Sequence, residues 1–367
     1  MIRVLHVMAC ADAGGISAVV LNYYRFIDRT KIHFDIALTV PEAGQNALAL
    51  QALGAEIFFL PLKSQGIRAF QTALAELLEK GGYDALHIHE SETCYVGLQV
   101  AKKLGIPCRI AHSHTCSPWE GWKGELRRLS GVMLNYPVAT RVIGCGQQAG
   151  DRVFGKINMR RPKALVLPNA VDTRRFAFCD QLRREVRQEL GVENRYVIGM
   201  VGRLSEEKNN IYALELMPGV LKEIPEAVLV VAGNGPDEDK FRKRVQELGL
   251  EGCVKQLGRR SDVERLYQAF DVYLLPSLTE GFPVAAVEAM ASGLPVLLSD
   301  AITRELSFGT AVQYLPLKEP RLWTQALRRW RQDDNRAVRQ TEPAENGLDI
   351  RSCARMLEQV YLEDQKR

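Results

Sequence analysis

Long apolar segments are missing from this 367-residue sequence, in which no run approaches the roughly 20 residues that a membrane-spanning helix needs. The eight cysteines form no C-x-x-C pair, and several lie in apolar segments where a free thiol behaves as a small hydrophobic group, so we expect a reduced, cytoplasmic protein. The first residues, MIRVLHVMACADAGG, predict a strand and its loop rather than a signal peptide. The net charge of +4 is too small to indicate a nucleic-acid partner.

Strand-like and helix-like segments alternate along the chain. In the first half the predicted strands are 2–8, 34–40, 56–60, 85–89, 108–112 and 141–145, with helices at 17–27, 69–79 and 94–103. From residue 196 the pattern restarts with the strands VIGMVGRL, VLVVAG, VKQLG, DVYLLPS, PVLLSD and AVQYLP. Two such runs predict an α/β protein with two doubly wound parallel-sheet domains.

A linker is expected in LPNAVDTRRF, residues 167–176, where Pro, Asn and Asp gather. We therefore divide the chain into a domain at 1–170, a domain at 171–348 and a closing helix within 349–367. Ligands of open α/β sheets bind beyond the carboxyl ends of the strands, so two facing sheets predict a cleft lined by the loops that follow strands.

The most informative segment is PSLTEGFPVAAVEAMASGLPV, residues 276–296, which follows a predicted strand. Gly281 permits a tight turn, and Pro283 suits the first position of a helix. Glu280 then lies in the loop and Glu288 within the helix, where both can accept hydrogen bonds from sugar hydroxyls beside a helix N-terminus that suits a phosphate. The simpler alternative is that the two carboxylates only stabilise the start of the helix.

A second segment, GRLSEEKNN, places Arg203 and Lys208 in the loop after another strand. Two fixed cations can neutralise a diphosphate whose negative charge grows as it leaves, and so can take the place of a metal ion. The alternative is a solvated loop in which Glu206 and Glu207 pair with these cations.

Two glycine turns also follow strands. Gly14 and Gly15 open a predicted helix, and Gly233 and Gly235 lie in GNGP, so the backbone at either turn can approach a ligand closely. Neither turn completes a G-x-G-x-x-G or a P-loop, which makes a nicotinamide or ATP site a weak hypothesis.

All six histidines precede residue 115, and two pairs close strands of the first sheet in HIHE and AHSHT. Cys108, His112, His114 and Cys116 are close enough in sequence for a metal site to be conceivable, but their spacing matches no common zinc pattern. The preferred interpretation is that these are polar residues at strand ends facing the cleft, where His114 can contact a sugar.

Together these segments resemble glycosyltransferase family 4, retaining enzymes of the GT-B fold, in which two Rossmann-like domains face a central cleft. The matches are E-x7-E at Glu280 and Glu288, the G-R…K loop at Arg203 and Lys208, the linker PNAVDTRRF, the glycines Gly14 and Gly15, and His114 after the fifth strand. In the linker, Ala170 stands where the family more often has Gly. The resemblance covers nearly the whole chain, and GGISAVVLNYYRFID, RIAHSHT and LDIRSCARMLEQVYLE resemble the exopolysaccharide and capsule branch.

The resemblance implies a role for each matched residue. Glu288 would bind the ribose of a nucleotide-sugar, Glu280 the donor hexose, and Arg203 with Lys208 the diphosphate. The implied donor site comprises Gly15, Arg203, Lys208, Gly233, Gly235, Glu280, Gly281, Phe282, Pro283, Val284 and Glu288, with His114, Glu280, Arg203 and Lys208 at the reacting centre. The closing helix would pack back on the first domain.

The implied reaction is transfer of a hexose with retention, from a donor expected to be a UDP-sugar rather than a GDP-sugar, to a saccharide or polyprenyl-linked acceptor bound by the first domain. No cofactor and no metal are expected, because no strand-end loop carries a D-x-D. Two alternatives are kept: a nucleotide-sugar epimerase of the same fold, and an inactive nucleotide-sugar-binding module.

Basic charge is concentrated between residues 121 and 187, where the sequence has 14 Lys or Arg and only 5 Asp or Glu. The segment SPWEGWKGELRRLSGVML adds aromatic and apolar residues at helical spacing: Trp119, Trp122, Lys123, Leu126, Arg127, Arg128, Leu129 and Met133. Such a helix either lies on an anionic membrane surface, which would make the enzyme peripheral on the inner face of the cell membrane, or buries its apolar stripe in the core.

Overall fold

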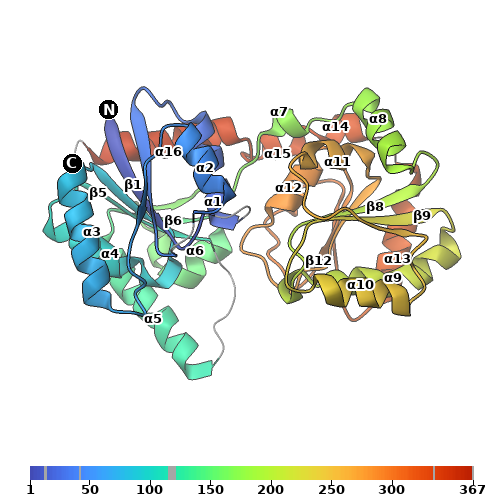
Figure 1. The fold of residues 1–367 in the computed structure, drawn as a ribbon, viewed down its shortest axis with the longest axis horizontal. Coiled ribbons are helices and arrows are strands. Elements are labelled where there is room, and N and C mark those ends of the chain that lie inside the picture. The colour runs from blue at the N-terminus through green and yellow to red at the C-terminus, as the bar shows by residue number, and fades with distance from the viewer. Residues whose placement is uncertain (12–14, 41–42, 115–120, 334, 366–367) are drawn as a thin grey trace. The chain divides into compact units, whose positions relative to one another are not determined.

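The structure is a computed structural model that describes residues 1–11, 15–40, 43–114, 121–333 and 335–365. The chain divides into two compact units, Met1–Ala170 together with Ile350–Arg367, and Val171–Asp349. Each unit is built around its own parallel sheet (Figure 1). The α/β class and the doubly wound architecture predicted from the alternating pattern are therefore confirmed.

The first unit holds a sheet in the order β3-β2-β1-β4-β5-β6-β7. Its strands are β1 (Ile2–Met8), β2 (Ile32–Leu38), β3 (Ile57–Phe59), β4 (Ala85–Ile88), β5 (Cys108–Ser113), β6 (Arg141–Gly144) and β7 (Ala164–Val166). The prediction missed β7, which has only three residues. It also placed β2 two residues late, because His33, near the start of the strand, is polar. Burial of Asp35 is possible because Arg3 pairs with its carboxylate at 2.8 Å.

Helices cover both faces of the first sheet. Their bounds are α1 (Gly15–Phe26), α2 (Gln45–Ala52), α3 (Ile67–Gly81), α4 (Cys94–Lys103), α5 (Gly121–Val138), α6 (Gln147–Phe154) and α16 (Ile350–Asp364), with short 3-10 turns η1 (Ser91–Thr93) and η2 (Asn158–Arg160). One apolar core joins α1, α2 and α16 to the sheet, and a second joins α3, α4 and α6 to its other face.

Helix α16 comes last in the chain but lies beside α1 and β1 of the first unit (Figure 1). Its apolar residues, among them Leu357 and Tyr361, belong to the same core as Val4 and Phe34. At its end the buried carboxylate of Asp364 lies 2.9 Å from the guanidinium of Arg141 on β6. The core and this ion pair hold the helix to the sheet.

The second unit repeats the topology with the order β10-β9-β8-β11-β12-β13. Its strands are β8 (Tyr196–Val201), β9 (Ala227–Ala232), β10 (Val254–Gln256), β11 (Val272–Leu275), β12 (Val296–Ser299) and β13 (Val312–Leu315). Its helices are α7 (Thr173–Phe176), α8 (Asp180–Leu190), α9 (Asn210–Glu223), α10 (Glu238–Glu247), α11 (Val263–Ala269), α12 (Val284–Ala291), α13 (Pro320–Arg329), α14 (Arg336–Arg339) and α15 (Glu342–Glu345), with η3 (Glu206–Lys208) and η4 (Trp330–Gln332). Helices α9, α10 and α13 share one apolar core with the sheet.

Strand order reverses at equivalent places in the two units, between β1 and β4 and between β8 and β11. At such a switch point the loops after neighbouring strands turn to opposite faces and leave a crevice at the carboxyl edge of the sheet. The segments singled out from the sequence follow β1, β4 and β5 in one unit and β8, β9 and β11 in the other.

Helix α5 exposes the apolar stripe that its spacing predicted. Trp122 is 73% exposed, Leu126 61%, Leu129 46% and Met133 69%, so the alternative that buries this stripe in the core is wrong. Trp119 lies outside the described residues. Across the described part of the chain, the helices are too short or too polar for any of them to span a membrane.

Candidate functional site

In the second unit, the loops after β8 and β9 are in direct backbone contact. A Cβ atom at Gly233 would lie 1.8 Å from the carbonyl oxygen of Gly202, and one at Gly235 would lie 2.2 Å from that of Leu204. The backbone N–H of Leu204 also donates to the carbonyl of Asn234 at 3.0 Å. The GNGP turn therefore needs glycine to let these two loops pack, a reason that the sequence did not reveal.

The loops after β8 and β11 bring the predicted cation and carboxylate together. The ammonium of Lys208 lies 2.6 Å from Oε1 of Glu280, and the hydroxyl of Ser277 donates to the same oxygen at 2.8 Å. The backbone N–H of Leu278 donates to the carbonyl of Glu207, which joins the two loops. Lys208 thus pairs across the sheet edge, and not with Glu207 as the solvated-loop alternative required.

Arg203 projects from the same edge with an exposed side chain. It lies two residues after the end of β8, whereas Lys208 ends the short helix η3. Asn209, which follows Lys208, has a left-handed backbone with a φ of 51°. Its side-chain amide donates a hydrogen bond to the carbonyl of Pro276 at 3.1 Å. This contact fixes the cation-bearing loop against the loop that carries Glu280.

Glu288 is the fifth residue of α12. Its carboxylate accepts a hydrogen bond from the hydroxyl of Tyr267 at 2.9 Å. Burial raises the pKa of Glu288 to about 7, although the Tyr267 hydrogen bond and the charge of Arg175 oppose that shift. Near neutral pH this carboxyl is therefore divided between its acid and ionised forms.

Other predicted donor-site residues lie around the start of α12 and at α1. Pro283 is the cap residue before α12 and not its first helical residue, because its ψ of 83° is not helical. The Phe282 side chain is buried, so this segment can meet a ligand mainly through its backbone. Gly15 begins α1 with φ of 59°, where a side chain would be strained, and Gly14 lies outside the described residues.

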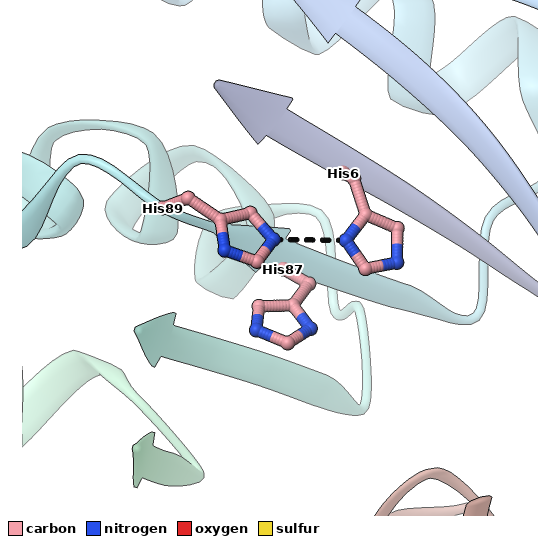
Figure 2. A group of neighbouring side chains, drawn as sticks. All are labelled: His6, His87 and His89. Carbon is pink, nitrogen blue, oxygen red and sulfur yellow. Dashed lines mark hydrogen bonds between the residues drawn. The ribbon is translucent and has the colours of Figure 1, made fainter. Parts of the chain in front are cut away.

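In the first unit, five histidines gather at the ends of β1, β4 and β5. They are His6, His87, His89, His112 and His114. Figure 2 shows His6 hydrogen-bonded to His89, with the ring of His87 beside both. The expectation that HIHE and AHSHT face an open cleft is wrong for His87 and His112, which are buried and hydrogen-bonded to each other.

Burial keeps these imidazoles neutral, because desolvation disfavours the charged ring. It lowers the pKa of His6 to about 3 and that of His114 to about 4, the latter against the opposing effect of the Asn169 side chain. The pKa values of His87, His89 and His112 are also well below the ordinary value for the same reason.

The histidines offer two groups of ring nitrogens close enough to consider for a metal ion: His6 with His87 and His89, and His89 with His112 and His114. Cys108 belongs to neither group, and Cys116 lies outside the described residues. The rings of His87 and His89 are stacked 4.3 Å apart at 16°, and those of His6 and His89 at 15°. Imidazole lone pairs lie in the ring plane, and such nearly parallel planes do not meet near the rings. The first group would have to rotate to bind a metal.

Sequence reasoning missed polar residues in both units: two that contact the glutamates of the second unit and one that contacts the histidines of the first. Tyr267 and Ser277 hydrogen-bond the two glutamates, and Tyr361 of α16 hydrogen-bonds His87 at 2.7 Å. Sequence reasoning did not single out His6, and its position inside the apolar strand β1 is the signal that could have drawn attention to it.

Comparison with known proteins agrees with this arrangement. Residues 13–175 match the family described as Glycosyltransferase Family 4, and residues 183–341 match Glycosyl transferases group 1. A putative glycosyltransferase EpsF of Bacillus subtilis (strain 168) is 33% identical over 336 residues, which cover 89% of this chain and 87% of that protein. An Escherichia coli UDP-Gal:alpha-D-GlcNAc-diphosphoundecaprenol alpha-1,3-galactosyltransferase is 29% identical, over 82% of this chain and 79% of its own.

The fold has close counterparts among solved structures. Anabaena Alr3699/HepE in complex with UDP superposes with a TM-score of 0.82 at 20% identity, over 99% of this chain and 100% of that one. WaaG, a glycosyltransferase of lipopolysaccharide biosynthesis, gives a TM-score of 0.69 at 16% identity, over 98% and 99%. The architecture is that of a GT-B glycosyltransferase. The chain belongs to glycosyltransferase family 4.

Acid should destabilise the protein through its buried histidines. With a folded pKa of about 3, His6 stays neutral in the native state but takes up a proton on unfolding at any pH between that value and about 6.5. The free energy of unfolding should therefore fall as the pH is lowered from 7 to 5, by about 2 kcal/mol from this residue alone. Urea unfolding of the wild type and of His6→Gln at both pH values measures the difference. An equal pH dependence in the two proteins would contradict the prediction.

Proposed function

We propose that this glycosyltransferase moves a hexose from a UDP-sugar to a hydroxyl of a saccharide or lipid-linked saccharide acceptor, with retention at the anomeric carbon, in the synthesis of an exopolysaccharide or other cell-surface glycan. The observation that carries the proposal is the contact between Lys208 and Glu280 at the carboxyl edge of the second sheet, where the loop of Lys208 also carries the exposed Arg203. The E. coli relative is described as using UDP-Gal and a diphosphoundecaprenol-linked acceptor, and Alr3699/HepE has been crystallised with UDP and glucose, which supports this donor and acceptor class.

Each polar group has a role that follows from its chemistry. Arg203 offers a planar fork and Lys208 a point charge, which together suit the two phosphates of the donor. Glu280 can accept hydrogen bonds from hexose hydroxyls, and Glu288 from the ribose. Further donor contacts are assigned to Gly15, Gly233, Gly235 and the segment Gly281, Phe282, Pro283 and Val284, and a sugar contact to His114.

The proposed step forms one bond and breaks another on the same face of the sugar. The acceptor oxygen forms a bond to the anomeric carbon while the bond between that carbon and the diphosphate oxygen breaks. The proton of the acceptor hydroxyl passes to the departing phosphate. Arg203 and Lys208 stabilise the charge that grows on the leaving group, so no enzyme nucleophile and no metal ion are required.

Replacing Lys208 tests this assignment. Lys208→Ala should lower kcat for sugar transfer about 100-fold, the cost typical of losing one preorganised charge-stabilising group. Transfer from UDP-, GDP-, ADP- and TDP-sugars to a lipid-diphosphate saccharide is measured by mass spectrometry, and UDP-sugars should be preferred. Lys222→Ala, an exposed lysine at the far end of α9, is the matched control and should keep full activity.

Near-normal transfer by Lys208→Ala would contradict the site. Conversion of the donor to an isomer without acceptor would instead indicate a nucleotide-sugar epimerase. Binding of the donor with no turnover would indicate an inactive nucleotide-sugar-binding module.

The pKa of Glu288 predicts a pH dependence of nucleotide binding. Only the ionised carboxylate can accept two hydrogen bonds from ribose hydroxyls, and with a pKa of about 7 its ionised fraction rises about tenfold between pH 6 and pH 8. The affinity for UDP should therefore rise by about that factor over the same interval. Calorimetric titration of the wild type and of Glu288→Gln, which cannot ionise, separates this effect from the titration of UDP itself. The same pH dependence in both proteins would refute the role.

We assign the enzyme to the cytoplasmic side of the membrane as a peripheral protein that uses helix α5. Trp122, Leu126, Leu129 and Met133 form an exposed apolar stripe on this helix, in the chain segment with the largest basic excess. The double variant Trp122→Ser and Met133→Ser should lower sedimentation with anionic liposomes at low salt at least fivefold. The control Leu48→Ser removes a similarly exposed residue from α2 and should bind normally. Equal binding by all three proteins would contradict the assignment.

A further inference from the structure

A continuous chain of hydrogen bonds runs through the first unit and includes the last helix of the protein. Its members in order are His112, His87, Tyr361, His6, His89 and His114. The links from His112 to His87 and from His87 to Tyr361 measure 3.1 and 2.7 Å, and that from Tyr361 to His6 measures 3.4 Å. The two links from His6 to His89 and from His89 to His114 each measure 2.9 Å.

Counting protons fixes how this chain can be arranged. Each neutral imidazole carries one N–H, and Tyr361 carries one O–H, so six protons serve five links. If every link holds one proton, the remaining proton lies at one end of the chain. The two end atoms, Nε2 of His112 and Nδ1 of His114, are both buried and lack a hydrogen-bond partner among the described residues. The chain therefore has two orientations, which differ in which end carries the proton.

The position of the Tyr361 hydroxyl selects between these orientations. Hydroxyl groups donate over shorter distances than N–H groups do, and the hydroxyl lies 2.7 Å from Nδ1 of His87 but 3.4 Å from Nε2 of His6. The hydroxyl therefore donates to His87 and accepts from His6. If it accepted from both rings, its buried proton would have no acceptor among the described residues.

The donor and acceptor roles of the Tyr361 hydroxyl determine those of every other hydrogen bond, toward both ends of the chain of contacts. Since His6 donates from Nε2, its Nδ1 accepts from His89, and His89 in turn accepts from Nε2 of His114. His114 is then protonated on Nε2 and has a bare lone pair on Nδ1. At the other end, His87 donates to His112, which carries the remaining proton on Nε2.

We propose that Tyr361 is a positioning residue that fixes the tautomer of His114, so that Nδ1 of His114 accepts a hydrogen bond from a sugar hydroxyl. The use of that hydrogen bond rests on the proposed function, whereas the tautomer rests on the chain of contacts alone. A neutral acceptor suits a hydroxyl, which must donate one hydrogen bond. The amide oxygen of Asn169, also buried and without a partner among the described residues, lies beside His114, so this place lacks a donor that a hydroxyl would supply.

The test compares the ring protonation and the activity of the full-length protein with and without the hydroxyl. Long-range ¹H–¹⁵N correlation of ¹⁵N-histidine-labelled protein shows which ring nitrogen carries the proton, and the His114 signals are assigned by their loss in His114→Gln. In the wild type, His114 should be protonated on Nε2 and bare on Nδ1. In Tyr361→Phe the chain is cut into two parts whose directions are no longer linked, so His114 should become a mixture of both tautomers.

The activity of Tyr361→Phe should fall about fivefold in kcat/KM for transfer, the size of one neutral hydrogen bond, with unchanged affinity for UDP. Tyr24→Phe is the matched control. Tyr24 is as buried as Tyr361 and packs on the same Phe34, but its hydroxyl contacts His33, outside the chain. This variant should keep both the His114 tautomer and the activity, whatever its stability.

A wild-type His114 that is protonated on Nδ1 would overturn the proposal, and this measurement requires neither the Tyr361→Phe variant nor a known substrate. An unchanged tautomer in folded Tyr361→Phe would overturn it as well. If the tautomer changes as expected while transfer is unaffected, the proposed hydrogen bond between His114 and the sugar is contradicted. Absence of any transfer by the wild type would instead count against the proposed function.

Discussion

All parallel strands of a doubly wound sheet point the same way, and this polarity places the strand-end segments described above at one edge of each sheet. Because the carboxyl ends of the strands share one edge, residues far apart in sequence meet there. In the second unit that edge joins Lys208 after β8 to Glu280 after β11, and the GNGP turn after β9 packs against Gly202 and Leu204. In the first unit the corresponding edge of its own sheet holds histidines from β1, β4 and β5.

The two edges share a topology but differ in their electrostatics. The second unit presents the exposed cation Arg203 and the Lys208–Glu280 pair, and it also holds Glu288, whose pKa is raised to about 7 by burial. Desolvation acts in the opposite direction on the pKa of the histidines, yet the result is the same, since burial favours the neutral form of every group. One edge therefore carries charged groups, and the other carries neutral imidazoles that are mostly buried.

Helix α16 shows how a segment can complete a unit from which it is remote in sequence. Its apolar face fills the core beside α1, and its Asp364 neutralises the buried Arg141 of β6. Tyr361 connects the helix to the histidines through hydrogen bonds to His87 and His6. The polar network of the first unit thus includes residues from both ends of the chain.

Much of this organisation is determined by the sequence itself. Apolar runs of the length and composition of buried strands predicted both sheets, because strands covered on both faces must be continuously apolar. The segments around Arg203, Glu280 and His114 were recognisable because strand-end loops are where such folds bind ligands. Two details were not predicted: the three-residue strand β7, and the first residues of β2, a strand whose buried Asp35 is made tolerable by distant partners that include Arg3 and Tyr83. Likewise, only the tertiary structure decided that Lys208 meets Glu280, that Gly233 is needed for contact with Gly202, and that the histidines bond to one another and to Tyr361. Those contacts depend on strand order, which local sequence patterns do not encode.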